Sequence, residues 1–246
     1  MATPPALHAD LTLAALRAGK HVIVEKPPFL RAADFAPVEA AARSAGRRVY
    51  VAENYHYKPL ARTLRRLLAD RVIGEVLFLH VNALKQQPVS GWRAQPEMAG
   101  GGALFEGGIH WVSFMAHLGL EVRDVRGFAP RSGRDERGVL AVFRYQGGAV
   151  GTLSHSWEVP SPLRGLSGSS IHGREGSIAF ESNGLGVAVW GRRKRLILPG
   201  VRDLAGRRAM WRDFVRALGG GPDPEYDLTL ARRDLELVER IYASLE

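Results

Sequence analysis

The chain of 246 residues predicts an α/β arrangement with a parallel sheet, followed by an α+β part built on an open-faced, mostly antiparallel sheet with helices. Up to Gly74, segments with helical periodicity alternate with short runs of β-branched residues. After Gly74, short apolar segments separated by glycine-containing turns dominate, as is typical of antiparallel strands. We therefore expect two domains, 1–74 and 75–246, with the terminal helices free to pack back on either one.

The first domain is expected to alternate three helices with two strands. Gly19 and Gly46 follow the first two helices, at the position where a left-handed residue commonly ends a helix. Pro37 is tolerated only in a first helical turn, so the second helix is expected to begin near Asp34. Such alternation with short links predicts parallel βα units. In chain order we expect a helix at 9–18, a strand at 21–25, a helix at 31–45, a strand at 48–52 and a helix at 60–70.

The second domain is expected to begin with a long strand, continue through a loop rich in glycine and proline, and enter a helix before a series of strands. Turn signals at 146–148, 174–176 and 182–184 separate some of these strands, and such short links predict antiparallel pairing of most neighbours. The expected elements are a strand at 76–84, a loop at 86–102, a helix at 107–118, strands at 122–128, 138–145, 149–157, 169–172, 177–181, 186–190 and 195–198, and helices at 210–218 and 228–245.

Composition limits the classes of function. The formal net charge is +9, but the arginines are scattered and often lie beside acids, and the dense run at 192–195 falls at an expected hairpin tip. Nucleic-acid or other phosphate binding through the arginines is therefore the weakest hypothesis. The absence of cysteine excludes disulfides, and no apolar run reaches the length of a membrane span. We expect a cytoplasmic protein with no membrane segment and no nucleic-acid partner.

The segment from His21 to Pro27 places a lysine at the end of an expected buried strand. Open α/β sheets carry their functional groups at the carboxyl ends of strands. Pro27 disfavours a helical conformation at Lys26, which is therefore expected in an extended or turn conformation. From this segment alone, a surface salt bridge between Glu25 and a neighbouring cation is the simpler interpretation.

Several motifs together resemble the Gfo/Idh/MocA oxidoreductase family, which includes glucose–fructose oxidoreductase and inositol dehydrogenase. The resemblance covers nearly the whole chain, and its combination of motifs is more specific than any single one. It is carried by residues 3–8 and 14–20, Glu25-Lys26-Pro27, Asn54, Trp92-Arg93, Gly100-Gly101-Gly102-Ala103-Leu104, Glu106 and His110. The resemblance implies a Rossmann-type nucleotide-binding domain followed by an open-faced sheet domain.

By this resemblance, the reaction is hydride transfer between a secondary alcohol of a sugar or cyclitol and the nicotinamide of NAD or NADP. The implied catalytic residues are Lys26, which would stabilise charge on the alcohol oxygen, His110, which would exchange its proton, and Glu106, which would orient Lys26 or a substrate hydroxyl. The family usually has Asp where this chain has Glu106, and many relatives carry Asp where it has Ser113. The implied cofactor-binding residues are Thr3, Pro4, Pro5, His8, Glu25, Asn54, Trp92 and Arg93; Tyr55 and Tyr57 are weaker candidates for stacking on a sugar ring.

A dinucleotide-binding domain of this type normally opens with a strand, a Gly-x-Gly-x-x-Gly turn and a helix, and no such motif follows any expected strand. About 70 residues, at ~30 per βα unit, would normally precede residue 1. We therefore expect an N-terminally shortened Rossmann-type sheet, weak or no NAD(P) binding by this chain, and poor solubility. The alternative hypothesis is a non-catalytic fragment or interaction module.

Two further expectations concern metals and assembly. Glu106, His110 and His117 share one helix face and provide a possible zinc-ligand set, which we rank well below the redox interpretation and do not adopt. The resemblance implies homo-oligomers formed through the sheet face. Alternation suggests Val139, Ala141 and Phe143 as apolar residues of such a face.

Overall fold

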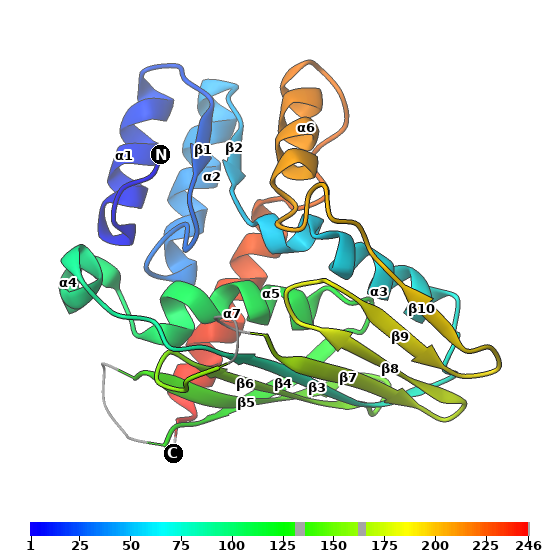
Figure 1. Cartoon of the computed structure of the whole chain (residues 1–246). Coiled ribbons are helices and arrows are strands. Elements are labelled where there is room, and N and C mark those ends of the chain that lie inside the picture. The colour runs from blue at the N-terminus through cyan, green and yellow to red at the C-terminus, as the bar shows by residue number, and fades with distance from the viewer. Residues whose placement is uncertain (131–135, 162–165, 246) are drawn as a thin grey trace.

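The structure, a computed structural model, describes residues 1–130, 136–161 and 166–245. It contains a two-stranded parallel sheet, β1–β2, and an eight-stranded sheet with the order β10-β9-β8-β7-β3-β6-β5-β4. Figure 1 shows the small sheet with its helices above the large sheet, and α5 and α7 between them. The fold expected from the sequence, a small parallel sheet followed by an open-faced and mostly antiparallel one, is thus confirmed.

The first part follows the expected order with small shifts of the ends. Gly19 and Gly46 have the left-handed φ values of 71° and 60° that their positions after the helices require. Pro37 lies in the first turn of its helix, as expected. The elements are η1 (Pro5–Leu7), α1 (His8–Arg17), β1 (Val22–Val24), η2 (Ala32–Asp34), α2 (Phe35–Ala45), β2 (Val49–Val51), η3 (Asn54–Tyr57) and α3 (Pro59–Ala69).

The second part contains the expected strands, together with short helices inside the segment that we predicted as a loop. Its elements are β3 (Val76–Leu84), η4 (Gly91–Ala94), α4 (Pro96–Ala99), the π-helical turn η5 (Leu104–Gly108), α5 (Ile109–Ala116), β4 (Val122–Phe128), β5 (Gly138–Tyr145), β6 (Val150–Ser156), β7 (Gly168–Gly173), β8 (Gly176–Glu181), β9 (Val187–Trp190), β10 (Arg195–Ile197), α6 (Arg207–Leu218) and α7 (Leu228–Ala243).

Antiparallel pairing holds for every described neighbour in the large sheet except β3 and β6, which are parallel. Four helical segments, η4, α4, η5 and α5, lie between β3 and β4 in sequence, so no short hairpin joins these two strands. Because β3 and β6 run parallel, their carboxyl ends lie side by side, near the N-terminal end of α5. The run at 192–195 does join two antiparallel strands, β9 and β10, as predicted.

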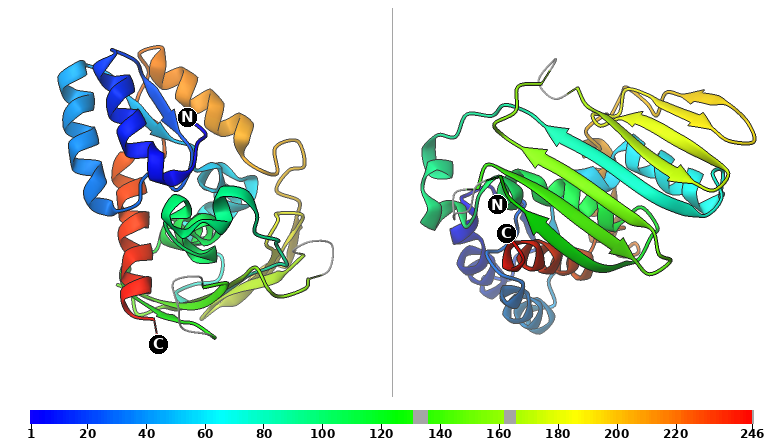
Figure 2. Two further views of the ribbon diagram at one scale, coloured as in Figure 1. Left: turned by 90° about the vertical axis from the view of Figure 1, so that its left-hand side faces the viewer. Right: turned by 90° about the horizontal axis from the view of Figure 1, so that it is seen from below.

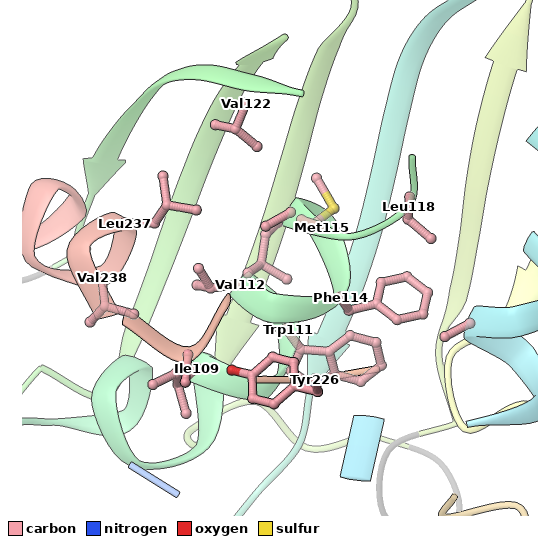
Figure 3. Packing of buried hydrophobic residues seen from close by; sticks show 14 of the residues in the cluster. Ile109, Trp111, Val112, Phe114, Met115, Leu118, Val122, Tyr226, Leu237 and Val238 are labelled. Carbon is pink, nitrogen blue, oxygen red and sulfur yellow. The ribbon is translucent and has the colours of Figure 1, made fainter. Parts of the chain in front are cut away.

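The core lies between the large sheet and α5, which is buried on nearly all sides. Figure 3 shows Val112 and Met115 of α5 pointing towards the strands, and Leu237 and Val238 of α7 packing beside them. Val139, Ala141 and Phe143 are at most 3% exposed and belong to this core. The expectation that these three residues form an open apolar face is therefore wrong: alternation identifies their common side, and the helices cover that side.

The opposite face of the large sheet faces the viewer in the right panel of Figure 2. Phe78 of β3 and Leu140 of β5 are 50% and 40% exposed, in contrast to the buried residues beside them on the same strands.

The two terminal helices, α6 and α7, pack against different parts of the chain. The ring of Phe214 in α6 stacks on Tyr50 of β2, whereas α7 contacts β2, β4 and α5. No helix among the described residues is both long and apolar enough to cross a membrane.

Candidate active site

Lys26 lies two residues after the end of β1 and reaches the second part of the chain. Its Nζ donates a hydrogen bond of 2.6 Å to the backbone oxygen of Glu106 and lies 3.4 Å from Glu106 Oε1. The side chains of Lys26 and Glu106 are only 15% and 9% exposed. The end of the small sheet and the turn that leads into α5 therefore meet at an ammonium–carboxylate pair.

A second cation binds the same carboxylate oxygen. Arg93 in η4 donates from Nε and from one terminal nitrogen to Glu106 Oε1, both at 3.2 Å, and its guanidinium lies 4.3 Å from the Trp92 ring. Burial of Glu106 opposes its ionisation, but Lys26 and Arg93 outweigh burial and lower the pKa of this carboxyl. Glu106 is thus a carboxylate at neutral pH, and the sequence motif Trp92-Arg93 does reach the site.

His110 is held by the carboxylate of Glu53, a residue that is not among those predicted from the sequence. Its Nδ1 lies 2.7 Å and 2.8 Å from the two carboxylate oxygens of Glu53, which is 1% exposed. Burial lowers the pKa of His110, and Glu53 only partly offsets this. The imidazole is therefore neutral at pH 7, and an Nδ1–H donated to Glu53 leaves Nε2 as the nitrogen able to accept a proton.

The segment that supplies Glu53 also fixes the ring of His110 by stacking. The ring of Tyr55 is stacked on the imidazole with centroids 4.3 Å apart and planes 10° apart. Lys58 Nζ lies 4.3 Å from the Tyr55 centroid, and its one hydrogen bond among the described residues is a 3.4 Å contact to the Ser182 backbone oxygen. Burial lowers the pKa of Lys58 to about 8 and raises that of Tyr55 to about 12. His110 is thus restrained in its plane by Glu53 and on its face by Tyr55.

A π-helical turn and two glycines set the position of Glu106 relative to His110. π-Helical turns are wider than α-helical ones and are frequent at functional sites. A Cβ at Gly107 would lie 2.9 Å from the Trp157 ring, and one at Gly108 would lie 2.8 Å from a Leu104 methyl group. Gly107 therefore lets this turn approach Trp157, at the end of β6, more closely than a residue with a side chain could.

The predicted cofactor-binding residues do not all have free polar groups. His8 is fully buried, and its ring nitrogens both lie 2.9 Å from backbone oxygens, those of Pro27 and Thr3, so it supports the backbone and offers no nitrogen to a ligand. The buried hydroxyl of Thr3 has no partner among the described residues. Asn54 donates from Nδ2 to the Ala205 backbone oxygen at 2.5 Å.

Three other residues at the start of the chain and at β1 were predicted to bind cofactor. Pro4 and Pro5 precede and open η1, and Pro5 is buried. Glu25 is exposed at the end of β1, and its backbone N–H donates to the Met1 oxygen. These positions surround the segment from which Lys26 projects, but none of the three makes a side-chain hydrogen bond among the described residues.

Two weaker expectations are not supported by the geometry. Tyr57 is 1% exposed and donates to Asp213 at 2.8 Å, so its ring is not available to a sugar. His117 pairs with Asp234 at 2.8 Å and not with Glu106 or His110. No metal-binding group of three His, Cys, Asp or Glu residues occurs within the described ranges.

Glu53 was missed although a signal existed. It directly follows the strand expected at 48–52 and lies two residues after the end of β2, at the carboxyl end where Asn54 was selected on the same argument. The backbone of η3 decides whether Glu53 or Asn54 faces the site. The Glu53 carboxylate also accepts a hydrogen bond of 2.9 Å from the backbone N–H of Tyr55 in η3. Chemically, the arrangement offers a neutral imidazole as proton acceptor, an ammonium to stabilise an oxyanion, and a carboxylate that orients the ammonium.

Comparison with known families agrees with this arrangement. Residues 1–53 match the family model described as an oxidoreductase family with an NAD-binding Rossmann fold, and residues 61–179 match the GFO/IDH/MocA C-terminal domain. A 1,5-anhydro-D-fructose reductase from Ensifer adhaerens is 30% identical over 187 residues, which are 72% of this chain and 55% of the relative. A levoglucosan dehydrogenase from Pseudarthrobacter phenanthrenivorans is 28% identical over 212 residues, which are 73% of this chain and 54% of the relative. The chain thus spans about half the length of these two relatives.

Solved structures show the same fold. A levoglucosan dehydrogenase in complex with NADH and levoglucosan superimposes with a TM-score of 0.84 and 23% identity, over 99% of this chain and 76% of that chain. GenD2 from gentamicin A biosynthesis, in complex with NAD, superimposes with a TM-score of 0.82 and 26% identity, over 99% of this chain and 74% of that chain.

Proposed function

Because this chain belongs to the Gfo/Idh/MocA oxidoreductase family, we propose that it carries the substrate-side groups of an NAD(P)-dependent oxidoreductase. The reaction is hydride transfer between nicotinamide and a secondary alcohol of a sugar or cyclitol. The observation that carries this proposal is the contact of Lys26 with Glu106, four residues before His110, together with the electrostatic effect of both charges on the His110 ring. The names of relatives that act on 1,5-anhydro-D-fructose and levoglucosan support the substrate class.

Each residue has one role in this mechanism. His110 Nε2 takes the hydroxyl proton when the alcohol is oxidised and returns it in the reverse direction, because burial keeps the ring neutral and Glu53 fixes its tautomer. Lys26 Nζ hydrogen-bonds the same oxygen and stabilises its developing negative charge. Glu106, paired with Arg93, holds the ammonium in place.

The residues present fit the nicotinamide end of the cofactor. The hydroxyl of Thr3, which is buried and has no partner among the described residues, and the exposed guanidinium of Arg93 are suited to its ribose or phosphate groups, together with Pro4, Pro5, Glu25, Asn54 and Trp92. The cofactor, NAD or NADP, accepts or donates the hydride. His8 is omitted from this set because both of its ring nitrogens are engaged within the chain.

The test uses the whole chain with two first probes: levoglucosan with oxidised NAD⁺ or NADP⁺, and the ketone 1,5-anhydro-D-fructose with reduced NADH or NADPH. Lys26→Ala and His110→Ala are each expected to lower turnover by about 100-fold or more, the usual contribution of general acid–base catalysis. Titrations that follow the fluorescence of the reduced nicotinamide in NADH and NADPH should show cofactor affinity within a factor of about three of the parent chain, because neither side chain is needed to hold the dinucleotide.

Lys20→Ala is the matched control, since this lysine is exposed, lies before β1 and makes no ion pair among the described residues. Its turnover should equal that of the parent chain. Full turnover in both Lys26→Ala and His110→Ala would remove the proposed roles. Failure of the parent chain to bind NAD(P) would agree with the weak binding expected because no Gly-x-Gly-x-x-Gly turn follows an expected strand, and it would favour the interaction-module hypothesis.

We also propose that residues 1–74 and 75–246 form the two domains. In addition, we propose that two copies of this chain associate through the open face of the large sheet. Phe78 and Leu140 project from that face and are 50% and 40% exposed, whereas Val139 on the covered side is 3% exposed. Phe78→Asp should shift light scattering towards the monomer mass. Phe78→Leu is the conservative control and should keep the mass of the parent chain. An unchanged mass for Phe78→Asp would rule out this face of the sheet as the interface.

A further inference from the structure

A cavity of about 310 Å³ adjoins the proposed reaction site. Arg93 and Glu106 form one wall, and Glu136, Arg137 and Trp157 line it as well. Glu136 and Arg137 lead into β5, whereas Trp157 follows β6, so the cavity lies where these two strands meet η5. Its volume is at the lower end of the range for small-molecule sites, ~300–1,000 Å³.

Three buried polar atoms in this wall have no partner among the described residues: Glu136 Oε2, Arg137 Nε and Trp157 Nε1. Glu136 and Trp157 are 4% and 3% exposed. Leaving such a group unsatisfied costs about 1–3 kcal/mol, so clustering of three around one cavity points to a polar occupant. Two are N–H donors and one is a carboxylate oxygen, a set that matches hydroxyl groups, which both donate and accept.

The charges favour a neutral occupant. Among the described residues that line the cavity, two arginines and two glutamates are charged, and Arg93 is already paired with Glu106. Glu136 uses Oε1 to accept from the Leu104 N–H at 2.7 Å and from the Tyr242 hydroxyl at 2.7 Å, which fixes the carboxyl and leaves Oε2 with no donor among the described residues. An anionic group would have to displace a carboxylate or lie beside Glu136.

We infer that this cavity is a subsite for the non-reacting, uncharged and hydroxyl-rich part of a sugar substrate. Its hydroxyls would accept from Trp157 Nε1 and Arg137 Nε and donate to Glu136 Oε2. This inference rests on the proposed function, because Glu106 and Arg93 connect the cavity with Lys26. It assigns substrate selection to three residues that take no part in proton or hydride transfer.

The test is titration of the ¹⁵N-labelled whole chain with D-glucose, followed by the indole N–H resonance of Trp157. This resonance is expected to shift saturably, and Trp157→Phe, which keeps an aromatic ring but removes the donor, should raise Kd for glucose about 5- to 10-fold, the effect of losing one neutral hydrogen bond. Trp211→Phe is the matched control, since Trp211 is 48% exposed on α6 and does not line the cavity. It should leave Kd unchanged.

If Trp157→Phe does not fold, Arg137→Lys, which removes Nε but keeps the charge, replaces it with the same expected weakening. Glucose binding that neither variant weakens, or an unmoved Trp157 resonance, means that only water fills the cavity and overturns the inference. D-Glucuronate binding more than tenfold tighter than glucose would overturn the neutral class. This readout needs no cofactor, so the two claims can fail separately. Glucose binding without any NAD(P)-dependent turnover would support the subsite and refute the proposed function. NAD(P)-dependent turnover without glucose binding in this cavity would support the proposed function and refute the subsite.

Discussion

Acid pH should unfold this protein because two histidines are buried as neutral rings. His155 in β6 is 2% exposed and His56 in η3 is 9% exposed. Burial lowers the pKa of each to about 3, with nearby Lys85 adding to the effect at His155 and Arg65 at His56. The unfolded chain takes up a proton at each ring near pH 6.5, whereas the folded chain does not, so stability falls as pH drops from 6.5 towards 3.

The magnitude follows from the difference in bound protons. Each histidine with a folded pKa far below 5 costs about 2 kcal/mol between pH 7 and pH 5, since each pH unit is worth 1.36 kcal/mol per proton. The two together therefore cost about 4 kcal/mol, a large share of a typical stability of ~5–15 kcal/mol. His110 also has a lowered pKa caused mainly by burial, and it acts in the same direction.

The assay is urea unfolding monitored by tryptophan fluorescence at half-unit steps from pH 7.5 to 5. His155→Gln should remove about 2 kcal/mol of the pH-dependent loss, whatever it does to stability at pH 7.5. His80→Gln is the control, because His80 is exposed on the open sheet face and its removal should not change the slope. Equal slopes for the parent chain and His155→Gln would refute the claim that His155 is neutral in the folded state.

Three further outcomes can be measured directly. Glu53→Gln should lower the pKa of His110 further, because the Glu53 charge raises it; an NMR titration that shows a rise would contradict the pairing. Gly102→Ala should cost about 2–3 kcal/mol in urea unfolding, as overpacking does, since its Cβ would lie 2.3 Å from the Glu136 backbone oxygen; an unchanged midpoint would contradict this close approach. Lys58→Met should raise the unfolding free energy at pH 7 by about 1–3 kcal/mol by removing a buried ammonium, and a net loss would mean that its contact with Tyr55 outweighs that cost.

The sequence predicts most elements here because their signals are local. Glycines after α1 and α2, β-branched runs in β1 and β2, and turn residues between the later strands are all read within a few positions. The parallel pairing of β3 with β6 depends on where distant segments dock, and no local pattern encodes it. The same holds for the side of β5 that is covered: alternation separates Val139 from Leu140, but only the position of α5 determines which one is buried.

Only the part of the candidate site that lies in local sequence motifs could be predicted, because contacts between distant segments leave no local signal. Lys26 and His110 lie in motifs that can be recognised in the sequence, whereas the roles of Glu53, Tyr55 and Trp157 arise from contacts with residues far along the chain. Each of these contacts joins two segments that are far apart in the sequence, and short-range periodicity does not predict which distant segments meet. Strand-end position narrows the candidates to Glu53 and Asn54, and the conformation of η3 decides between them.

The site depends on how firmly the two parts of the chain are held together. The Lys26–Glu106, Glu53–His110 and Tyr55–His110 contacts all join a residue before Gly74 to one after it. A shift of about 1 Å between the parts would disturb all three, and misplacement of that size can cost about 100-fold in rate. Helix α7 opposes such a shift, because Glu239 accepts from the Ala32 N–H while the Tyr242 hydroxyl accepts from the Phe105 N–H beside Glu106. The C-terminal helix therefore belongs to the functional architecture although it contributes no catalytic side chain.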